Sequence, residues 1–570
     1  MKFIYILIVA LGIGFIGNAQ TQQTSLNGAW DFFASNNKTE YEVLANYNIE
    51  WDKITVPGNW DTQDAYAEYI GKGYYQKEFK VSSSWKGKQI RIKFGAVYQT
   101  SKVWVNGKQL GVHFGGYTPF EYNITDVINF GKPNTVLVMA DNSYKRGAWW
   151  AWGGISRDVT LTANDDVHLI YQHISAIPDF NSNKVRFVLK YKVENNACNT
   201  YKAKISSIIN GHGFEKELSS KISITGKSIQ TKEITFEEDL SHFQLWDFNH
   251  PHLYALTSEL KAKGHMDSKT DKFGIRKLEV RGEQMFLNNA PVRMNGLNRV
   301  HDHPKYGNTE PDQLVKQDML DIKSLGCNFA RLMHAPLSEN LLEFCDSIGF
   351  LLIEEIPVWG NDDPQSFPDN PLTKKWLKDM IERDFNHPSV VGWSVGNELR
   401  DSVPNWGKKL LTARQHDYVA SMLDYIDELD TTRLKTFVSL TAYSEGANPS
   451  NEPVDKVDFI CINSYGNSAK AVRDTHKKFP GIPIFLSEVG RSQIGPAPDA
   501  KFKEDLVTYM REMKDYPYLI GISYWCYNDY RSNYKGTPES GFREWGVVDE
   551  NRKPKAAYQQ LKEIYENWNK

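Results

Sequence analysis

The sequence predicts a multidomain protein in which two antiparallel β-sandwiches precede a parallel (β/α)8 barrel. Three observations support this fold class: short strands separated by turns fill the first third of the chain, a second all-β block follows, and strands then alternate with helices. A chain of 570 residues is too long for one ordinary domain, and 41% apolar residues are enough for several cores. We expect the three domains to cover residues 20–165, 166–277 and 278–570.

The first sandwich is predicted from β-branched or alternating runs at 89–94, 102–105 and 134–140. Asn106-Gly107, after the second run, is a strong signal for a tight hairpin. The next block has similar runs at 185–193, 201–209 and 253–260. Its length fits a single immunoglobulin-like β-sandwich.

From Leu278 onward, strand patterns alternate with helical patterns. Eight candidate strands lie at 292–297, 328–332, 350–354, 390–395, 436–440, 459–463, 482–487 and 520–525. Candidate helices lie at 312–326, 376–385, 410–429, 502–513 and 556–565. This rhythm is typical of a closed (β/α)8 TIM barrel. An open doubly wound sheet is the alternative, but no G-x-G-x-x-G segment follows the first strand to favour it.

Residues 1–19 have the pattern of a secretory signal peptide, with Lys2, an apolar run and Gly17-Asn18-Ala19 as a small-x-small cleavage site. An uncleaved anchor is the competing interpretation, although the run is short for a membrane span. We therefore expect a secreted or periplasmic protein. No later segment is apolar for long enough to insert into a membrane, and a net charge of −3 provides no basic surface for nucleic acid. The five dispersed Cys residues show no zinc spacing, so we expect no metal.

Two glutamates follow apolar barrel strands. Strand 390–395 leads into Asn397-Glu398, and strand 482–487 leads into Glu488. A buried carboxylate costs free energy unless it is paired or used, and a structural salt bridge is the alternative for each. Because functional groups gather at the C-terminal ends of barrel strands, strands four and seven would bring both to one mouth. Glycoside hydrolysis with retention needs such a pair, one as acid/base and one as nucleophile, and no cofactor.

Four segments resemble family 2 glycoside hydrolases. The motif at 393–398 (WSVGNE) resembles the acid/base signature, and 485–490 (FLSEVG) resembles the nucleophile motif. Residues 273–276 (FGIR) and 387–391 (HPSVV) resemble the entry into the barrel and the lead-in to strand four. The resemblance covers essentially the whole mature chain. It implies a sugar-binding-like jelly-roll sandwich, an immunoglobulin-like sandwich and a catalytic barrel, with Glu398 as acid/base and Glu488 as nucleophile.

The resemblance also implies roles for further residues. Arg331 and His334 match an Arg-x-x-His-x-Pro segment at the end of strand two, and Arg331 is expected to favour the ionised nucleophile. Asn397 would hydrogen-bond the sugar 2-hydroxyl. Tyr465 resembles the tyrosine near the nucleophile, and Trp525 would form a wall of the sugar site.

The loop after strand one departs from the pattern of the family. It resembles a galactosidase-like Asn-Arg-His-Glu segment, but Val300 and His301 replace the His-Glu pair, which puts any sugar or metal contact there in question. His301, Asp302 and His303 could form a metal site. We expect instead that His301 and Asp302 line the substrate pocket, because no further ligand is evident.

Different segments of the sequence predict different sugars for the substrate. Segments 102–106 and 115–121 look like β-glucuronidases, and Asn533-Tyr534-Lys535 fits the Asn-x-Lys motif with which those enzymes bind the uronic acid carboxylate. Segment 527–531 looks more galactosidase-like, and Arg531 is a second candidate cation. The sequence favours an exo-β-glucuronidase acting on a carbohydrate substrate, with β-galactosidase as the alternative. A non-catalytic carbohydrate-binding protein is the rival class, and a homo-oligomer is compatible with either.

Overall fold

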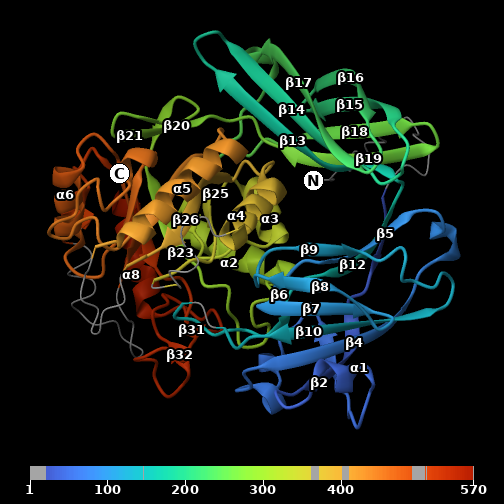
Figure 1. Cartoon of the computed structure of the whole chain (residues 1–570). Helices are drawn as coiled ribbons and strands as arrows, with labels where there is room; N and C mark the ends of the chain where they lie inside the picture. Colours follow the sequence, from blue (N-terminus) through green and yellow to red (C-terminus); the bar gives the residue numbers. More distant parts are fainter. Residues whose placement is uncertain are drawn as a thin grey trace, which may run out of the picture.

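A computed structural model describes residues 21–144, 147–360, 362, 371–400, 410–490, 508 and 510–568. In Figure 1 the blue first domain and the green second domain lie on one side of the molecule, and the yellow-to-red barrel lies on the other. The predicted signal peptide and most of the predicted helix at 502–513 lie outside the described residues. Within the described ranges, no helix is long and apolar enough to cross a membrane.

The first domain is a β-sandwich. Its elements are β1 (Gln22–Ser25), β2 (Gly28–Ala34), α1 (Glu40–Leu44), β3 (Asp52–Val56), β4 (Lys72–Lys80), β5 (Gln89–Phe94), β6 (Val97–Tyr98), β7 (Thr100–Val105), β8 (Lys108–Phe114), β9 (Phe120–Asn123), β10 (Pro133–Asp141), β11 (Gly154–Ile155) and β12 (Val159–Asn164). The two main sheets have the orders β1-β12-β5-β9 and β3-β2-β4-β10-β7-β8. Phe32, Ile92 and Val138 belong to the core between them. Asn106 and Gly107 have φ values of 50° and 80°, as a tight hairpin turn between β7 and β8 requires.

The second domain is a sandwich of a three-stranded and a four-stranded antiparallel sheet. Its strands are β13 (Val167–Asp179), β14 (Lys184–Asn195), β15 (Tyr201–Gly211), β16 (Phe214–Ile224), β17 (Ser228–Asp239), β18 (Tyr254–Ala262) and β19 (His265–Phe273). The sheet orders are β13-β14-β17 and β16-β15-β18-β19. Burial alternates along β14, where Val185, Phe187 and Leu189 face the core, and this period of two is the pattern that predicted the strand.

A closed barrel of eight parallel strands confirms the predicted fold class. A small sheet comes first, formed by β20 (Leu278–Arg281), β21 (Gln284–Leu287) and β22 (Ala290–Val292). The barrel strands are β23 (Met294–Asn298), β24 (Phe329–Arg331), β25 (Leu351–Glu355), β26 (Val390–Asn397), β27 (Leu434–Ser439), β28 (Ile460–Asn463), β29 (Ile484–Val489) and β30 (Leu519–Trp525). Parallel pairing of β23 with β30 closes the ring. All eight predicted strands are therefore present, with ends that shift by a few residues.

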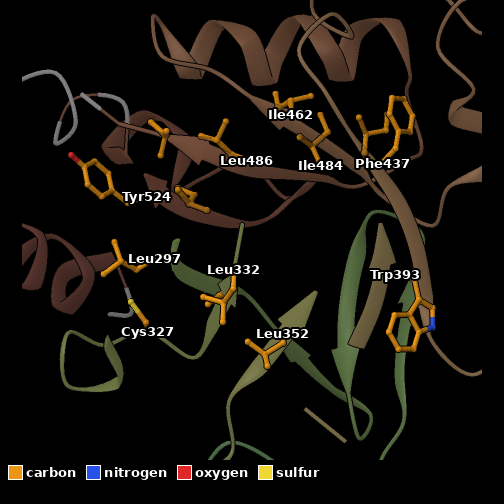
Figure 2. Packing of buried hydrophobic residues seen from close by; sticks show 14 of the residues in the cluster. Leu297, Cys327, Leu332, Leu352, Trp393, Phe437, Ile462, Ile484, Leu486 and Tyr524 are labelled. Carbon is orange, nitrogen blue, oxygen red and sulfur yellow. The ribbon is translucent and has the colours of Figure 1, made fainter. Parts of the chain in front are cut away.

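Helices surround the barrel. They include α2 (Asp312–Ser324), α3 (Glu339–Ile348), α4 (Pro371–Asp384), α5 (Ala413–Leu429), α6 (Ser468–Lys478) and α8 (Ala556–Trp568). The sequence patterns did not predict α3 and α6. Apolar side chains of these helices and of the strands form one large buried cluster, and Figure 2 shows labelled members on the strands such as Leu352, Trp393 and Ile462. The short hairpin of β31 (Tyr530–Arg531) and β32 (Phe542–Arg543) follows β30.

A second apolar cluster, which includes Phe329 and Ile353, brings barrel strands together with the small sheet. Side chains alternate between the two faces of a strand, so the residue two positions later shares the same face. Arg331 follows Phe329 in this way, and Glu355 follows Ile353. The alternation therefore places charged side chains inside the barrel at its C-terminal mouth.

Candidate active site

A cavity of about 730 Å³ opens at the C-terminal mouth of the barrel. Its lining comes from the ends of several strands and from the loops that follow them. These residues include Trp149, His334, Trp359, Asn397, Glu398, Tyr465, Glu488, Trp525, Tyr534, Arg543 and Trp545. The structure thus brings six of the predicted site residues around one space, and a seventh, Arg331, lies directly behind them.

Both predicted glutamates are buried at the cavity wall. Glu398 follows β26 directly and is 6% exposed, and Glu488 lies within β29 and is 3% exposed. The backbone of Glu398 has a φ of 51°, in the left-handed region that non-glycine residues seldom adopt. Its amide donates to the carbonyl of Val438, which helps to hold this conformation. Such strain often occurs at functional sites, where the surrounding structure over-determines the backbone.

Two donors hold the carboxylate of Glu488. Arg331, at the end of β24 and fully buried, donates from Nη1 to Glu488 Oε1 at 2.7 Å. The hydroxyl of Tyr465 donates to the other oxygen, Oε2. Arg331 also donates from Nη2 to Glu355 at 2.9 Å and to Asn397 Oδ1 at 2.7 Å. Glu488 therefore accepts a charge-assisted hydrogen bond on one oxygen and a hydroxyl hydrogen bond on the other.

The environment of Glu398 is different. Burial, followed by the nearby charge of Glu488, raises the pKa of Glu398 to about 7. Asn463 donates to Glu398 Oε1 at 3.0 Å, and Arg400 Nη1 lies 3.6 Å from Oε2, and both lower the pKa in part. The site therefore holds two carboxyl groups in contrasting environments, one protonated near neutral pH and one held by donors. This is the arrangement that acid/base chemistry with a carboxylate partner requires.

Asn397 and His334 line the cavity beside the two glutamates. The Oδ1 atom of Asn397 accepts from Arg331 and from Asn463, which fixes its amide plane and leaves Nδ2 as the donor end. His334 stacks on Trp525 with ring centroids 5.8 Å apart, and its Nδ1 lies 2.9 Å from Glu355. Trp525 forms one wall, as predicted from its place at the end of strand eight.

Sequence reasoning missed three residues that organise this site. Glu355 binds both Arg331 and His334, and Asn463 bridges Asn397 and Glu398. The sequence pattern that predicted Glu398 and Glu488 also occurs at Glu355, because the buried strand β25 ends in two glutamates. Trp149 is the third, and it reaches the cavity from the first domain. Its ring centroid lies 5.3 Å from that of His334, and the run of three tryptophans at 149–152 was its signal.

The prediction that His301 and Asp302 line the pocket is wrong. Both are buried, and neither belongs to the cavity wall. Asp302 accepts a hydrogen bond from Trp152 Nε1 at 2.6 Å and another from the backbone amide of Arg531 at 3.2 Å. His301 packs 5.4 Å from the ring of Tyr117. The loop therefore joins the barrel to the first domain, with Asp302 hydrogen-bonded across the contact and the ring of His301 packed against Tyr117.

The predicted cations for a sugar carboxylate lie outside the cavity. The guanidinium of Arg531 stacks 3.9 Å from the ring of Trp150 and donates to Glu68 and to the carbonyl of Ala67, so it belongs to the same domain interface. Asn533 and Lys535 are exposed, and neither lines the cavity. Tyr534, between them, and Arg543 on β32 line it instead. In the described ranges, no group of three His, Cys, Asp or Glu side chains is arranged to hold a metal.

Family comparisons match three consecutive segments that together run from residue 23 to residue 482. Three models of glycosyl hydrolases family 2 match: the sugar binding domain over residues 23–165, a second domain of the family over 167–276, and the TIM barrel domain over 278–482. A β-galactosidase of Thermoanaerobacter pseudethanolicus is 28% identical over 553 residues, covering 93% of this chain and 69% of the relative. A putative β-glucuronidase of Formosa agariphila is 30% identical over 504 residues, covering 84% of this chain. The chain spans 58% of that relative, little more than half its length.

Solved structures show the same architecture. The crystal structure of a β-glucuronidase from Bacteroides uniformis superposes with a TM-score of 0.84 at 25% identity, covering 96% of this chain and 70% of that one. A family 2 β-galacturonidase from Eisenbergiella tayi superposes with a TM-score of 0.83 at 23% identity, which shows the shared fold.

Proposed function

The chain belongs to glycosyl hydrolases family 2, and from this premise we propose that it is a retaining exo-β-glycosidase with Glu398 as acid/base and Glu488 as nucleophile. The observation that carries the proposal is the contrast between the two carboxyls. Burial and the neighbouring charge keep the pKa of Glu398 at about 7, while Arg331 and Tyr465 donate to Glu488. One mouth therefore offers a proton donor and an anionic nucleophile to the same bond.

The first step forms a covalent intermediate. A carboxylate oxygen of Glu488 attacks the anomeric carbon, the bond from that carbon to the glycosidic oxygen breaks, and the leaving oxygen takes the proton of Glu398. Charge on Glu488 falls as its ester forms, so the pKa of Glu398 falls as well, because the Glu488 charge is one of its two raising causes. Glu398 is then an anion when the second step needs a base.

The second step returns the enzyme to its starting state. Glu398 removes a proton from water, the water oxygen attacks the anomeric carbon, and the ester bond to Glu488 breaks. Two displacements at one carbon retain its configuration. Asn397, whose amide plane is fixed by Arg331 and Asn463, supplies a donor at the cavity wall for a sugar hydroxyl.

For the sugar, we propose a terminal β-glucuronide. Relatives named as β-glucuronidases and a cavity wall that carries a cation, Arg543, support this choice. A β-galactoside is the second candidate, because a relative covering 93% of this chain is a β-galactosidase. From the pattern at residues 1–19 we also propose export to the periplasm or medium. N-terminal sequencing of the native protein tests this: a mature chain beginning at Gln20 is expected, and an N-terminus at Met1 would contradict it.

Substitution of the two glutamates tests the mechanism. Glu488→Gln should reduce hydrolysis of aryl β-glycosides by at least about 10⁴-fold, because it removes the nucleophile while keeping side-chain size. Glu452→Gln is the matched control, because Glu452 is as buried as Glu488 but lies outside the cavity. Its activity should stay at the wild-type level. Wild-type rates in Glu488→Gln would refute the assignment.

Azide provides a second readout. In Glu488→Gly, azide should enter the vacated space and give a glycosyl azide of inverted configuration. In Glu398→Gly, azide should intercept the covalent intermediate and give a glycosyl azide of retained configuration. Identical products from both variants would contradict the division of roles between Glu398 and Glu488.

A further inference from the structure

Arg543 occupies an unusual position in the cavity. It lies on β32, whose pairing with β31 places Arg543 opposite Tyr530 in the hairpin after the last barrel strand. Both residues line the cavity together with Trp525, the end of that strand. The hairpin therefore brings a guanidinium to the wall beside Trp525, about twenty residues after the barrel itself has closed.

The charge of Arg543 is not matched by a neighbouring carboxylate. Among the described cavity-lining residues, Lys470 is the other Lys or Arg, and it forms an ion pair with Asp474. Close to the same space, Arg331 pairs with Glu355 and Glu488, and Arg400 lies 3.6 Å from Glu398. In the described part of the chain, no carboxylate lies within ion-pair distance of Arg543.

Arg543 uses few of its N–H donors, and one of them forms a side-chain hydrogen bond with Tyr530 across the hairpin. Its Nη1 reaches the carbonyl of Lys535 at 3.5 Å, at the outer limit for a hydrogen bond. Its Nε is buried and, among the described residues, has no hydrogen-bond partner. A guanidinium carries five N–H groups in a planar fork that matches a carboxylate. A cation held at a cavity wall with so few partners is suited to an anion that enters the cavity.

Aromatic rings hold the guanidinium in place. The rings of Tyr534 and Trp545 each lie 5.6 Å from its central carbon. Trp545 in turn packs edge-on against Tyr465 at 5.4 Å, and Tyr465 donates to Glu488. The ring of Trp545 therefore lies between the guanidinium of Arg543 and Tyr465. Because Tyr465 contacts Glu488, the guanidinium is close to the part of the cavity that holds the proposed nucleophile.

We propose that Arg543 binds the carboxylate of a uronic acid at the terminal sugar position and so selects β-glucuronides over neutral β-glycosides. This inference rests on the proposed function and names the residue that reads the substrate. Carboxylate recognition is thereby assigned to Arg543 on β32 and not to Lys535, the exposed residue in the loop between β31 and β32. A neutral sugar would leave the guanidinium without a counter-charge in a partly buried site, whereas a carboxylate satisfies both its charge and its geometry.

Paired substrates test the proposal. Initial rates should be measured on an aryl β-glucuronide and on the matching aryl β-glucoside, which differ at C6 alone, and on the aryl β-galactoside. Arg543→Gln should lower kcat/KM for the glucuronide by roughly 10- to 100-fold, mainly through KM, and change the neutral substrates by less than about threefold. Arg543→Lys should fall between the two, because it keeps the charge but loses the fork. Lys535→Gln is the matched control and should leave all three rates unchanged.

Three results would overturn the proposal: equal losses on charged and neutral substrates, selective loss in Lys535→Gln, or a wild-type preference for the neutral substrates. Calorimetric titration with free D-glucuronate provides a test that needs no turnover. Binding to the wild type should weaken at least about tenfold in Arg543→Gln, and unchanged binding would refute the role of Arg543. Failure of the glycosidase mechanism would appear separately, as activity retained in Glu488→Gln.

Discussion

Arg400 lies beside the proposed acid, so its removal should shift the pH range in which that acid works. Arg400 Nη1 is 3.6 Å from Glu398 Oε2, and its charge lowers the pKa of Glu398 against the larger raising effects of burial and Glu488. Arg400→Met removes the charge and keeps most of the side-chain volume. Loss of a nearby cation disfavours the carboxylate, so the pKa of Glu398 should rise and the protonated acid should persist to higher pH.

The size of this effect follows from the distance. Two unit charges 3.6 Å apart attract by about 1 kcal/mol in a water-like dielectric and by about 5 kcal/mol at an effective dielectric of 20. The two side chains are 14% and 9% exposed, so the true value lies between these limits. One pKa unit corresponds to about 1.4 kcal/mol. The alkaline limb of kcat/KM, expected near pH 7 in the wild type, should therefore move upward by at least about 0.7 pH unit.

The assay is the pH dependence of kcat/KM on an aryl β-glycoside from pH 5 to pH 10. Arg400→Lys is the control, and its limb should stay within about 0.3 pH unit of the wild type because the charge remains. A substrate whose leaving group needs no protonation should show a flatter alkaline limb, which identifies the limb as acid catalysis. A limb that stays in place in Arg400→Met, or that moves to lower pH, would refute the electrostatic account of Glu398.

Three further changes test other contacts. Tyr465→Phe removes a hydroxyl that donates to Glu488 and should lower kcat about 10- to 100-fold; unchanged pre-steady-state rates would contradict this role. Trp149→Ala removes a cavity wall supplied by the first domain and should raise KM roughly 3- to 10-fold with little change in kcat, as steady-state kinetics would show. Burial raises the pKa of Glu452 to about 7, so its stabilising contribution is lost as pH rises from about 4.5 to 7. Glu452→Gln should therefore increase the free energy of unfolding by about 2 kcal/mol more at pH 8 than at pH 5, and equal melting-temperature shifts at both pH values would contradict it.

Local patterns were sufficient for the architecture and for the two central glutamates. Strand alternation and turn signals are short-range properties, and they located all eight barrel strands to within a few residues. Once the strands were counted, Glu398 and Glu488 followed, because each stands at or near the end of an apolar run and the C-terminal ends of barrel strands meet at one mouth. The helices α3 and α6 were not among the helices that these patterns predicted.

Loop residues were predicted less well, for a physical reason. His301, Asp302 and Arg531 carry the polar groups expected of a sugar site, yet packing against the first domain uses all three. Lys535 and Arg543 are both cations in the segment after β30, and hairpin geometry alone decides that Arg543 faces the cavity while Lys535 faces solvent. No local pattern in the chain distinguishes these outcomes.

The sequence by itself determined the order of domains, the barrel and the position of two carboxyl groups on its fourth and seventh strands, because hydrophobic periodicity and strand-end position are carried by neighbouring residues. Tertiary structure alone decided how those carboxyls differ. Arg331 donates to Glu488 across 157 positions of the chain, and Asn463 reaches Glu398 across 65. The pKa of an acidic side chain depends on burial and on partners that meet only when the chain has folded, and so does the choice of which cationic side chain faces the cavity.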